Sequence, residues 1–183
     1  MFVVVTIAVV LAVAVTVLVA RWPSSTDSST YGGLPSWLPT STVAVGRVVT
    51  ASAAHPALAI EGDSVVADLA HGHVLVTAVG PAVPAEGQFP MPRTSPCTFT
   101  ITLADASGAV PVSAAAFSIV DELGQVHRPQ VTAQGGQPPP TSVRPGRPLV
   151  LTLTDVLPVG SGTLRWAPQG AKVVSWDFEV EID

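Results

Sequence analysis

Cysteine and lysine are almost absent from this chain of 183 residues, which has one of each, Cys97 and Lys172. A single cysteine cannot close a disulfide within the chain. Charged residues make up 11% of the sequence, and eight basic residues against thirteen acidic ones give a net charge of −5. Because nucleic-acid binding needs a dense cationic surface, this composition excludes a nucleic-acid partner.

Recognisable catalytic motifs are missing as well. The sequence contains no Gly-x-Ser-x-Gly, no His-Glu-x-x-His, no phosphate-binding loop and no Gly-x-Gly-x-x-Gly. These spacings bring a nucleophile, a metal or a phosphate to the groups that activate it. We therefore predict that the protein is not an enzyme and carries no cofactor.

Long helices are disfavoured beyond the first twenty residues, because the chain has 18 prolines and 15 glycines. Short runs rich in Val, Thr, Leu and Ile follow Thr42, and Gly and Pro separate them. Residues 43–183 are thus predicted to form a mainly β domain, an immunoglobulin-like antiparallel β-sandwich. One or two weak strands are expected between Val43 and Val66, and the clearer ones are His73–Val79, Cys97–Leu103, Ala116–Asp121, Val126–Thr132, Leu149–Thr154, Thr163–Trp166 and Val173–Ile182.

Two of these runs alternate cleanly between apolar and polar residues, which indicates half-buried strands. In the first, Phe99 and its apolar partners face away from Thr98, Thr100 and Thr102, and Cys97 is placed on the threonine side or just outside the strand. The last run has one face of Trp176, Phe178, Val180 and Ile182 and one of Asp177, Glu179, Glu181 and Asp183. We predict that its aromatic face is core, with Trp166 as a third aromatic, and that its acidic face is solvated. Pro129 indicates an edge strand or a bulge.

The N-terminal run Phe2–Ala20 has no charged residue, and its only polar side chains are Thr6 and Thr16. As a helix, its nineteen residues would reach roughly 28 Å, close to the hydrocarbon thickness of a bilayer. The basic residues of a secretion signal are missing before it, and a good cleavage site is missing after it. We predict that residues 1–20 are a retained membrane anchor. Cleavage as a signal peptide, which would release a secreted protein, is the alternative.

Residues 21–42 are dominated by Ser, Thr, Pro and Gly, which predicts a flexible linker. Arg21 directly after the apolar run favours, by the positive-inside rule, a cytoplasmic C-terminal domain. One arginine is a small bias, and long domains cross the membrane largely regardless of charge. We therefore place the protein in the cell membrane with a single span and an extracytoplasmic C-terminal domain.

His71 and His73 are the candidate metal ligands. Side chains two residues apart on a strand share a face, so two imidazoles can hold one copper or zinc ion. His55, His127 and Met91 are possible further ligands. The competing interpretation is a pair of exposed histidines beside a turn glycine.

Three segments resemble the telokin-like, immunoglobulin-fold domains of secreted and membrane-anchored actinobacterial proteins: Phe117–Gly124, Arg144–Leu153 and Trp176–Asp183. The resemblance covers roughly residues 70–183. It implies an outward-facing sandwich and carries no functional residue. Our leading hypothesis is a membrane-tethered, non-enzymatic domain that binds a protein or cell-envelope partner, with Gly80–Pro96 and Gln134–Pro145 as expected surfaces. The alternatives are a metal carrier that uses His71 and His73, and a structural accessory subunit of a membrane complex.

Overall fold

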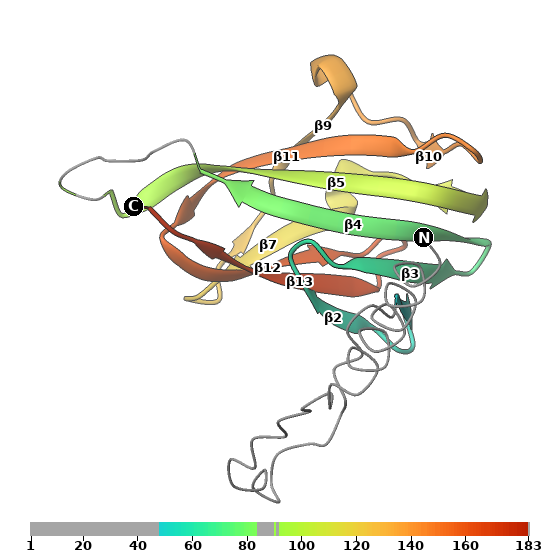
Figure 1. Ribbon diagram of the computed structural model, residues 1–183, viewed down its shortest axis with the longest axis horizontal. Helices are drawn as coiled ribbons and strands as arrows, with labels where there is room; N and C mark the ends of the chain where they lie inside the picture. The colour runs from blue at the N-terminus through green and yellow to red at the C-terminus, as the bar shows by residue number, and fades with distance from the viewer. Residues whose placement is uncertain (1–47, 84–89, 91, 183) are drawn as a thin grey trace, which may run out of the picture. The chain divides into compact units, whose positions relative to one another are not determined.

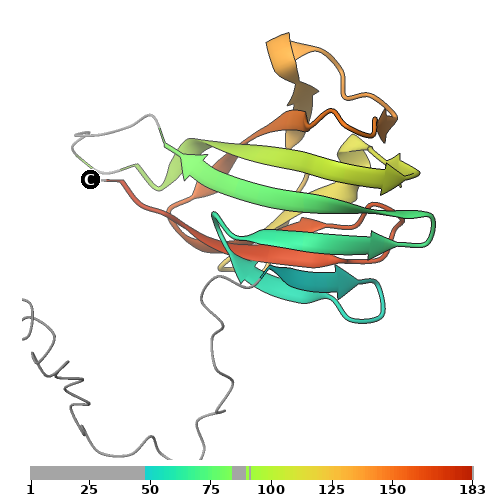
Figure 2. The ribbon, with the colours of Figure 1, turned by 45° about the vertical axis from the view of Figure 1, so that its right-hand side comes forward.

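Two β-sheets pack face to face in the computed structural model, which describes residues 48–83, 90 and 92–182 (Figures 1 and 2). The six-stranded sheet has the order β1-β3-β4-β5-β11-β9, the five-stranded sheet the order β2-β13-β12-β7-β8, and β10 pairs with β6. The prediction of a mainly β sandwich is therefore confirmed. The elements are β1 Val49–Ser52, β2 Ala57–Ile60, β3 Ser64–Leu69, β4 Gly72–Ala82, β5 Thr94–Gly108, β6 Val110–Pro111, η1 Ala114–Ala116, β7 Phe117–Asp121, β8 Val126–His127, β9 Gln130–Ala133, η2 Gln134–Gly136, β10 Ser142–Val143, β11 Leu149–Pro158, β12 Gly160–Trp166 and β13 Val174–Val180.

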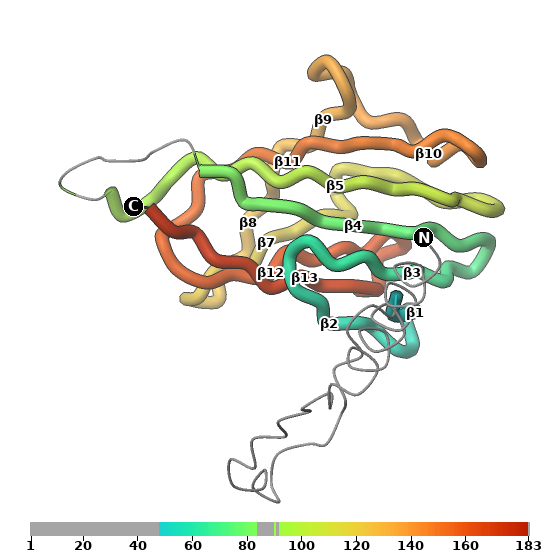
Figure 3. The backbone as a smooth tube through the Cα atoms, viewed as in Figure 1, coloured from blue at the N-terminus to red at the C-terminus, as the bar shows by residue number. Residues whose placement is uncertain are grey.

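The sandwich is not purely antiparallel, which corrects the prediction. Strand β1 runs parallel to β3, and β2 runs parallel to β13. The chain leaves β1 in one sheet, crosses to β2 in the other, and returns to β3 (Figure 3). The chain reverses its direction at each crossing. Strand β3 therefore runs in the same direction as its neighbour β1. This part of the chain is thus three short strands in two sheets, where we predicted one or two.

The predicted strand Val126–Thr132 is divided at Pro129, which also corrects the prediction. Strand β8 pairs with β7 at one edge of the five-stranded sheet, and β9 pairs with β11 at one edge of the six-stranded sheet. Proline has no N–H to donate to a strand ladder. The chain therefore changes sheets at this residue, so that both parts of the run lie at edges, as the proline indicated.

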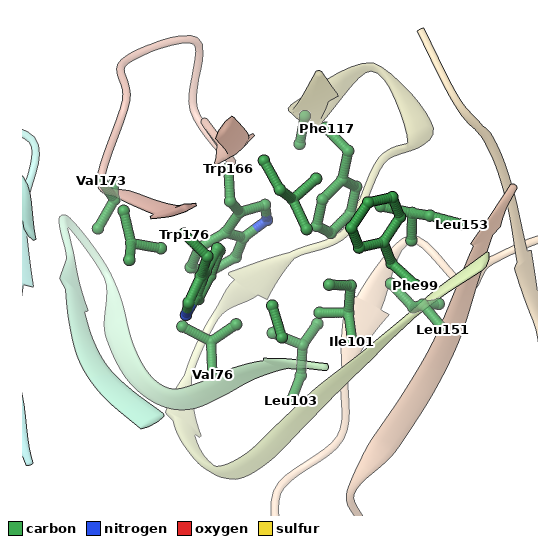
Figure 4. Packing of buried hydrophobic residues seen from close by; sticks show 14 of the residues in the cluster. Val76, Phe99, Ile101, Leu103, Phe117, Leu151, Leu153, Trp166, Val173 and Trp176 are labelled. Carbon is green, nitrogen blue, oxygen red and sulfur yellow. The ribbon is translucent and has the colours of Figure 1, made fainter. Parts of the chain in front are cut away.

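Aromatic and branched side chains from both sheets fill the space between them (Figure 4). Trp166 and Trp176 are each 1% exposed and Phe178 is 6% exposed, which confirms the predicted core face of β13 and the third aromatic. The indole N–H of Trp176 donates to the carbonyl oxygen of Asp63 at 3.1 Å. This bond satisfies the polar atom of a buried ring, as buried tryptophans require.

The ring of Phe178 lies edge-on to that of Phe99, with ring centres 4.8 Å apart and planes at 70°. Gly162 lies opposite Phe178 on the neighbouring strand β12. A Cβ at Gly162 would overlap the Phe178 ring, so this glycine leaves the space that the ring occupies. Phe117 and Trp166 form a second aromatic pair, with ring centres 6.4 Å apart.

Strands β4 and β5 come unusually close at the end where β3 turns into β4. The backbone N–H of Ala109 donates to the carbonyl oxygen of His71 at 2.7 Å. A Cβ at Gly72 would overlap the carbonyl oxygen of Ser107, and one at Gly108 would overlap that of His71. Gly108 also has a φ of +72°, a conformation that glycine adopts without steric cost. Both glycines are therefore needed for this close approach.

The predicted anchor, residues 1–20, and the predicted linker, residues 21–42, lie outside the described residues, as do the first residues of the predicted domain. In the part of the chain that is described, no helix is both long enough and apolar enough to cross a bilayer. Anchor and linker therefore stay predictions.

Candidate binding face

The two predicted metal ligands lie at the tip of the hairpin formed by β3 and β4. His71 belongs to the turn, and His73 is on β4, opposite Asp68 and Ser107. Both imidazoles are exposed. Among the residues that the structure describes, no group of three or more His, Cys, Asp or Glu side chains is placed to hold a metal ion. A metal site at His71 and His73 stays a prediction.

His127, one of the possible further ligands, instead pairs with Asp121. Its Nε2 atom lies 2.9 Å from Oδ2 of Asp121. The other carboxylate oxygen accepts backbone N–H groups of Leu123 at 3.0 Å and Gln125 at 2.8 Å. The hydrogen bond with His127 has the largest effect on the pKa of Asp121 and lowers it; burial opposes it with the next largest effect, and the two backbone donors lower the pKa further. Through these hydrogen bonds, the carboxylate of Asp121 stabilises the turn between β7 and β8.

The lowered pKa of Asp121 makes the stability of the fold dependent on pH. A carboxyl group whose pKa is lower in the folded state stabilises that state above its unfolded pKa, about 3.9 for aspartate. This stabilisation is lost as the pH falls through the lower, folded-state pKa. We expect wild type to be more stable than Asp121→Asn near pH 7, and the difference to shrink near pH 3. Urea unfolding of both proteins at the two pH values measures this, and an equal difference at both would contradict it.

Cys97 lies on the opposite side of β5 from the one predicted. Residues two apart on a strand share a face, so Cys97 points inward with Phe99 and away from Thr98. Its side chain is 1% exposed, and its sulfur lies 3.4 Å from the carbonyl oxygen of Ser95. Burial raises the pKa of the thiol. The side chain is therefore a protonated core group rather than a nucleophile.

The outer face of the five-stranded sheet carries charge. Asp177 and Glu179 of β13 are exposed there, as predicted, and the hydroxyl of Thr163 donates to Asp177 at 3.1 Å. Exposed Arg165 belongs to the same face on β12. Strand β2 pairs with the outer side of β13, so β13 is not an edge strand of its sheet. Leu58 and Ile60 of β2, 69% and 63% exposed, border this charged surface.

The outer face of the six-stranded sheet carries a block of uncharged side chains, nearly all of them β-branched. Strand pairing places Thr77 beside Thr102 and Val150 in one row, and Val79 beside Thr100, Thr152 and Thr132 in the next. A third row continues with Thr98, Thr154 and Gln130. We call this surface the threonine face. Its members are Thr77, Val79, Thr98, Thr100, Thr102, Gln130, Thr132, Val150, Thr152, Thr154 and Val156.

A shallow hollow of about 500 Å³ bounds the threonine face at its β9 edge. Thr132, Val150 and Thr152 line it from the sheet, and η2 lines it from the side. A hydrogen bond of 2.7 Å from the N–H of Ala133 to the carbonyl oxygen of Gln137 closes the loop that carries η2 (Figure 1). The expected surface Gln134–Pro145 thus begins at this hollow. The other expected surface, Gly80–Pro96, lies partly outside the described residues.

The sequence signal for this face was the run Thr98-Phe99-Thr100-Ile101-Thr102, in which the threonines alternate with core residues. Within one strand, this alternation assigns only the side that faces the core. The threonines of β4, β9 and β11 lie on the same surface only because these strands are neighbours of β5 in the sheet. The alternation within one strand does not predict which strands are its neighbours. The candidate site was therefore missed, although each of its strands was predicted at least in part.

Comparisons with known proteins add two structural similarities. A secreted protein of Mycobacterium tuberculosis, MPT63, is similar at 12% identity and a TM-score of 0.47, over 68% of this chain and 99% of that protein. An uncharacterised β-sandwich protein of Clostridium difficile 630 is similar at 8% identity and a TM-score of 0.44, over 68% of this chain and 95% of that protein. No protein-family model matches the sequence, and no curated protein matches it. The resemblance to telokin-like domains stays a prediction.

Proposed function

We propose that this protein is a non-enzymatic, membrane-anchored domain outside the cytoplasm, which holds a protein or cell-envelope partner on its threonine face. The observation that supports this is the contrast between the outer face of the five-stranded sheet and the threonine face of the six-stranded sheet, outside which the exposed Asp68 of β3 lies. One outer face carries Asp177, Glu179 and Arg165, whereas the threonine face has only hydroxyl, methyl and amide groups at the positions named above.

Such a face suits protein association for a physical reason. Charged side chains are depleted at the centre of protein interfaces, because each must be stripped of water when the partner binds. Threonine and valine lose little side-chain freedom on burial, because branching at Cβ already restricts χ1. The anchor of residues 1–20 would keep the domain near other membrane proteins and the envelope. Recognition by a sandwich then needs no catalytic group.

An arginine placed on the threonine face tests this function. We expect the full chain, extracted from membranes in mild detergent, to migrate as a complex larger than one copy. Thr100→Arg and Thr154→Arg should release the single chain, because the new charge would be buried by the partner. Ser161→Arg, on an exposed position of the opposite sheet, is the matched control and should leave the complex intact. An unchanged complex in both threonine variants, or wild-type protein found only in the culture medium, contradicts the proposal.

A further inference from the structure

We infer that the partner on the threonine face is a second copy of this chain, so that two sandwiches pair through their six-stranded sheets. This inference rests on the proposed function, because it names the partner of the same face. Two identical sheets can stack across a two-fold axis with their side chains interleaved, at the spacing of about 10 Å that is usual between packed sheets.

The charge distribution favours this arrangement. Each chain carries a net charge of −5, so two copies repel each other on approach. Exposed acidic side chains of the described residues lie on and just after β13, on the turns that follow β2 and β7, at Asp105 of β5, and at Asp68 on the outer face of β3. The three rows of the threonine face carry none. Pairing through these rows leaves the acidic groups of both copies outside the contact.

The chemistry of the face fits a copy of itself better than other envelope ligands. Threonine hydroxyls both donate and accept hydrogen bonds, so a hydroxyl surface is complementary to an identical one. Ser64 and Thr77 already pair in this way within the sheet, with their oxygens 2.6 Å apart. A charged polymer would find no opposite charge in the three rows. All five aromatic side chains of the described residues are buried, so a sugar has no ring on which to stack.

The size of the face is also adequate. The rows lie on β4, β5, β11 and β9, which contain 11, 15, 10 and 4 residues, and each residue of a sheet covers about 3.4 Å by 4.8 Å. This footprint is on the order of 600 Å² per copy before the relief of the side chains is counted. A standard interface buries about 800 Å² per partner, so the sheet offers enough surface for a stable pair.

Photo-crosslinking of the full chain separates this inference from the proposed function. Cells would produce two differently tagged copies, each with a photo-reactive residue in place of Thr100 or, separately, Thr154. We expect an adduct of twice the 18.7 kDa mass of the chain that carries both tags. The same residue in place of Ser161, on the opposite sheet, is the control and should give no such adduct.

A charge exchange at the centre of the face supplies the second readout. Thr100 lies in the middle row, so we place it nearest the two-fold axis of the pair, where it faces its own equivalent in the other copy. Thr100→Arg alone and Thr100→Asp alone should each lower the yield of the doubly tagged adduct from Thr154 about tenfold or more. Producing the two variants together should restore it. A thermal melt of each variant separates lost pairing from lost folding.

Each outcome decides between the two claims. A doubly tagged adduct with rescue by the opposite charge supports self-pairing. An adduct from Thr100 to a different protein overturns self-pairing and leaves the proposed function standing. Folded protein that gives no adduct from either threonine position overturns both. An equal yield of doubly tagged adduct from Ser161 overturns the assignment of the contact to this face.

Discussion

Replacing Phe178 with alanine is expected to lower the free energy of unfolding by about 3–5 kcal/mol, the usual cost of removing a buried aromatic ring. The ring contacts Phe99 edge-on and fills the space that Gly162 leaves open on β12. Its removal therefore leaves a cavity between the two sheets that neither the glycine nor the opposing ring can fill. Chemical denaturation of the two proteins at neutral pH gives the difference directly.

Glu179→Ala is the matched control, because it removes a side chain of similar length from the next position on the same strand. Glu179 is exposed on the outer face of β13, so we expect a change within about 0.5 kcal/mol. If Phe178→Ala changed stability by less than about 1 kcal/mol, the assignment of the two faces of β13 would be wrong.

Gly108→Ala is the second substitution with a large expected effect, a loss of about 2–5 kcal/mol. Part of the loss arises from the φ of +72°, which costs a residue with a Cβ about 1–2 kcal/mol. The rest arises because the new methyl group overlaps the carbonyl oxygen of His71 and forces β4 and β5 apart. Thermal unfolding with a fitted free energy measures the total.

Gly124→Ala separates these two contributions. Gly124 has a φ of +79°, and a Cβ there would meet no atom within 4 Å. This variant should therefore show only the backbone cost of about 1–2 kcal/mol. Equal losses in Gly108→Ala and Gly124→Ala would mean that the close approach of β4 and β5 contributes nothing to the fold.

The parts of the fold that were predicted correctly depend only on the residue pattern within a single strand. The alternation in β13 assigned Trp176 and Phe178 to the core and Asp177 to solvent, because a period of two residues decides the face within one strand. The same rule applied to β5 should have placed Cys97 with Phe99. That error lay in applying the rule at the end of the run, where the strand extends beyond the predicted boundary to Thr94.

Features that depend on which strands are neighbours were not predicted. The parallel pairs at β1 and β2 arise because the chain crosses between sheets, and no residue pattern within either strand encodes that crossing. The threonine face has the same origin, since its rows join the consecutive strands β4 and β5 to β11 and β9, which come later in the sequence. The fold of the described residues does not test the membrane anchor, the linker or the metal site at His71 and His73. These three stay predictions.

The parallel pairing of β2 with β13 determines how the sandwich bears mechanical load. The chain enters β2 at Ala57, opposite Val174, and leaves β13 beyond Val180, at the other end of the pair. Tension applied between the start of β2 and the end of β13 therefore slides these strands along each other instead of peeling them apart. Under such shear the hydrogen bonds of the pair share the force and must break together. Since β1 precedes β2 and pairs in parallel with β3, tension from the N-terminal end of the domain reaches the β2–β13 pair only after β1 has separated from β3.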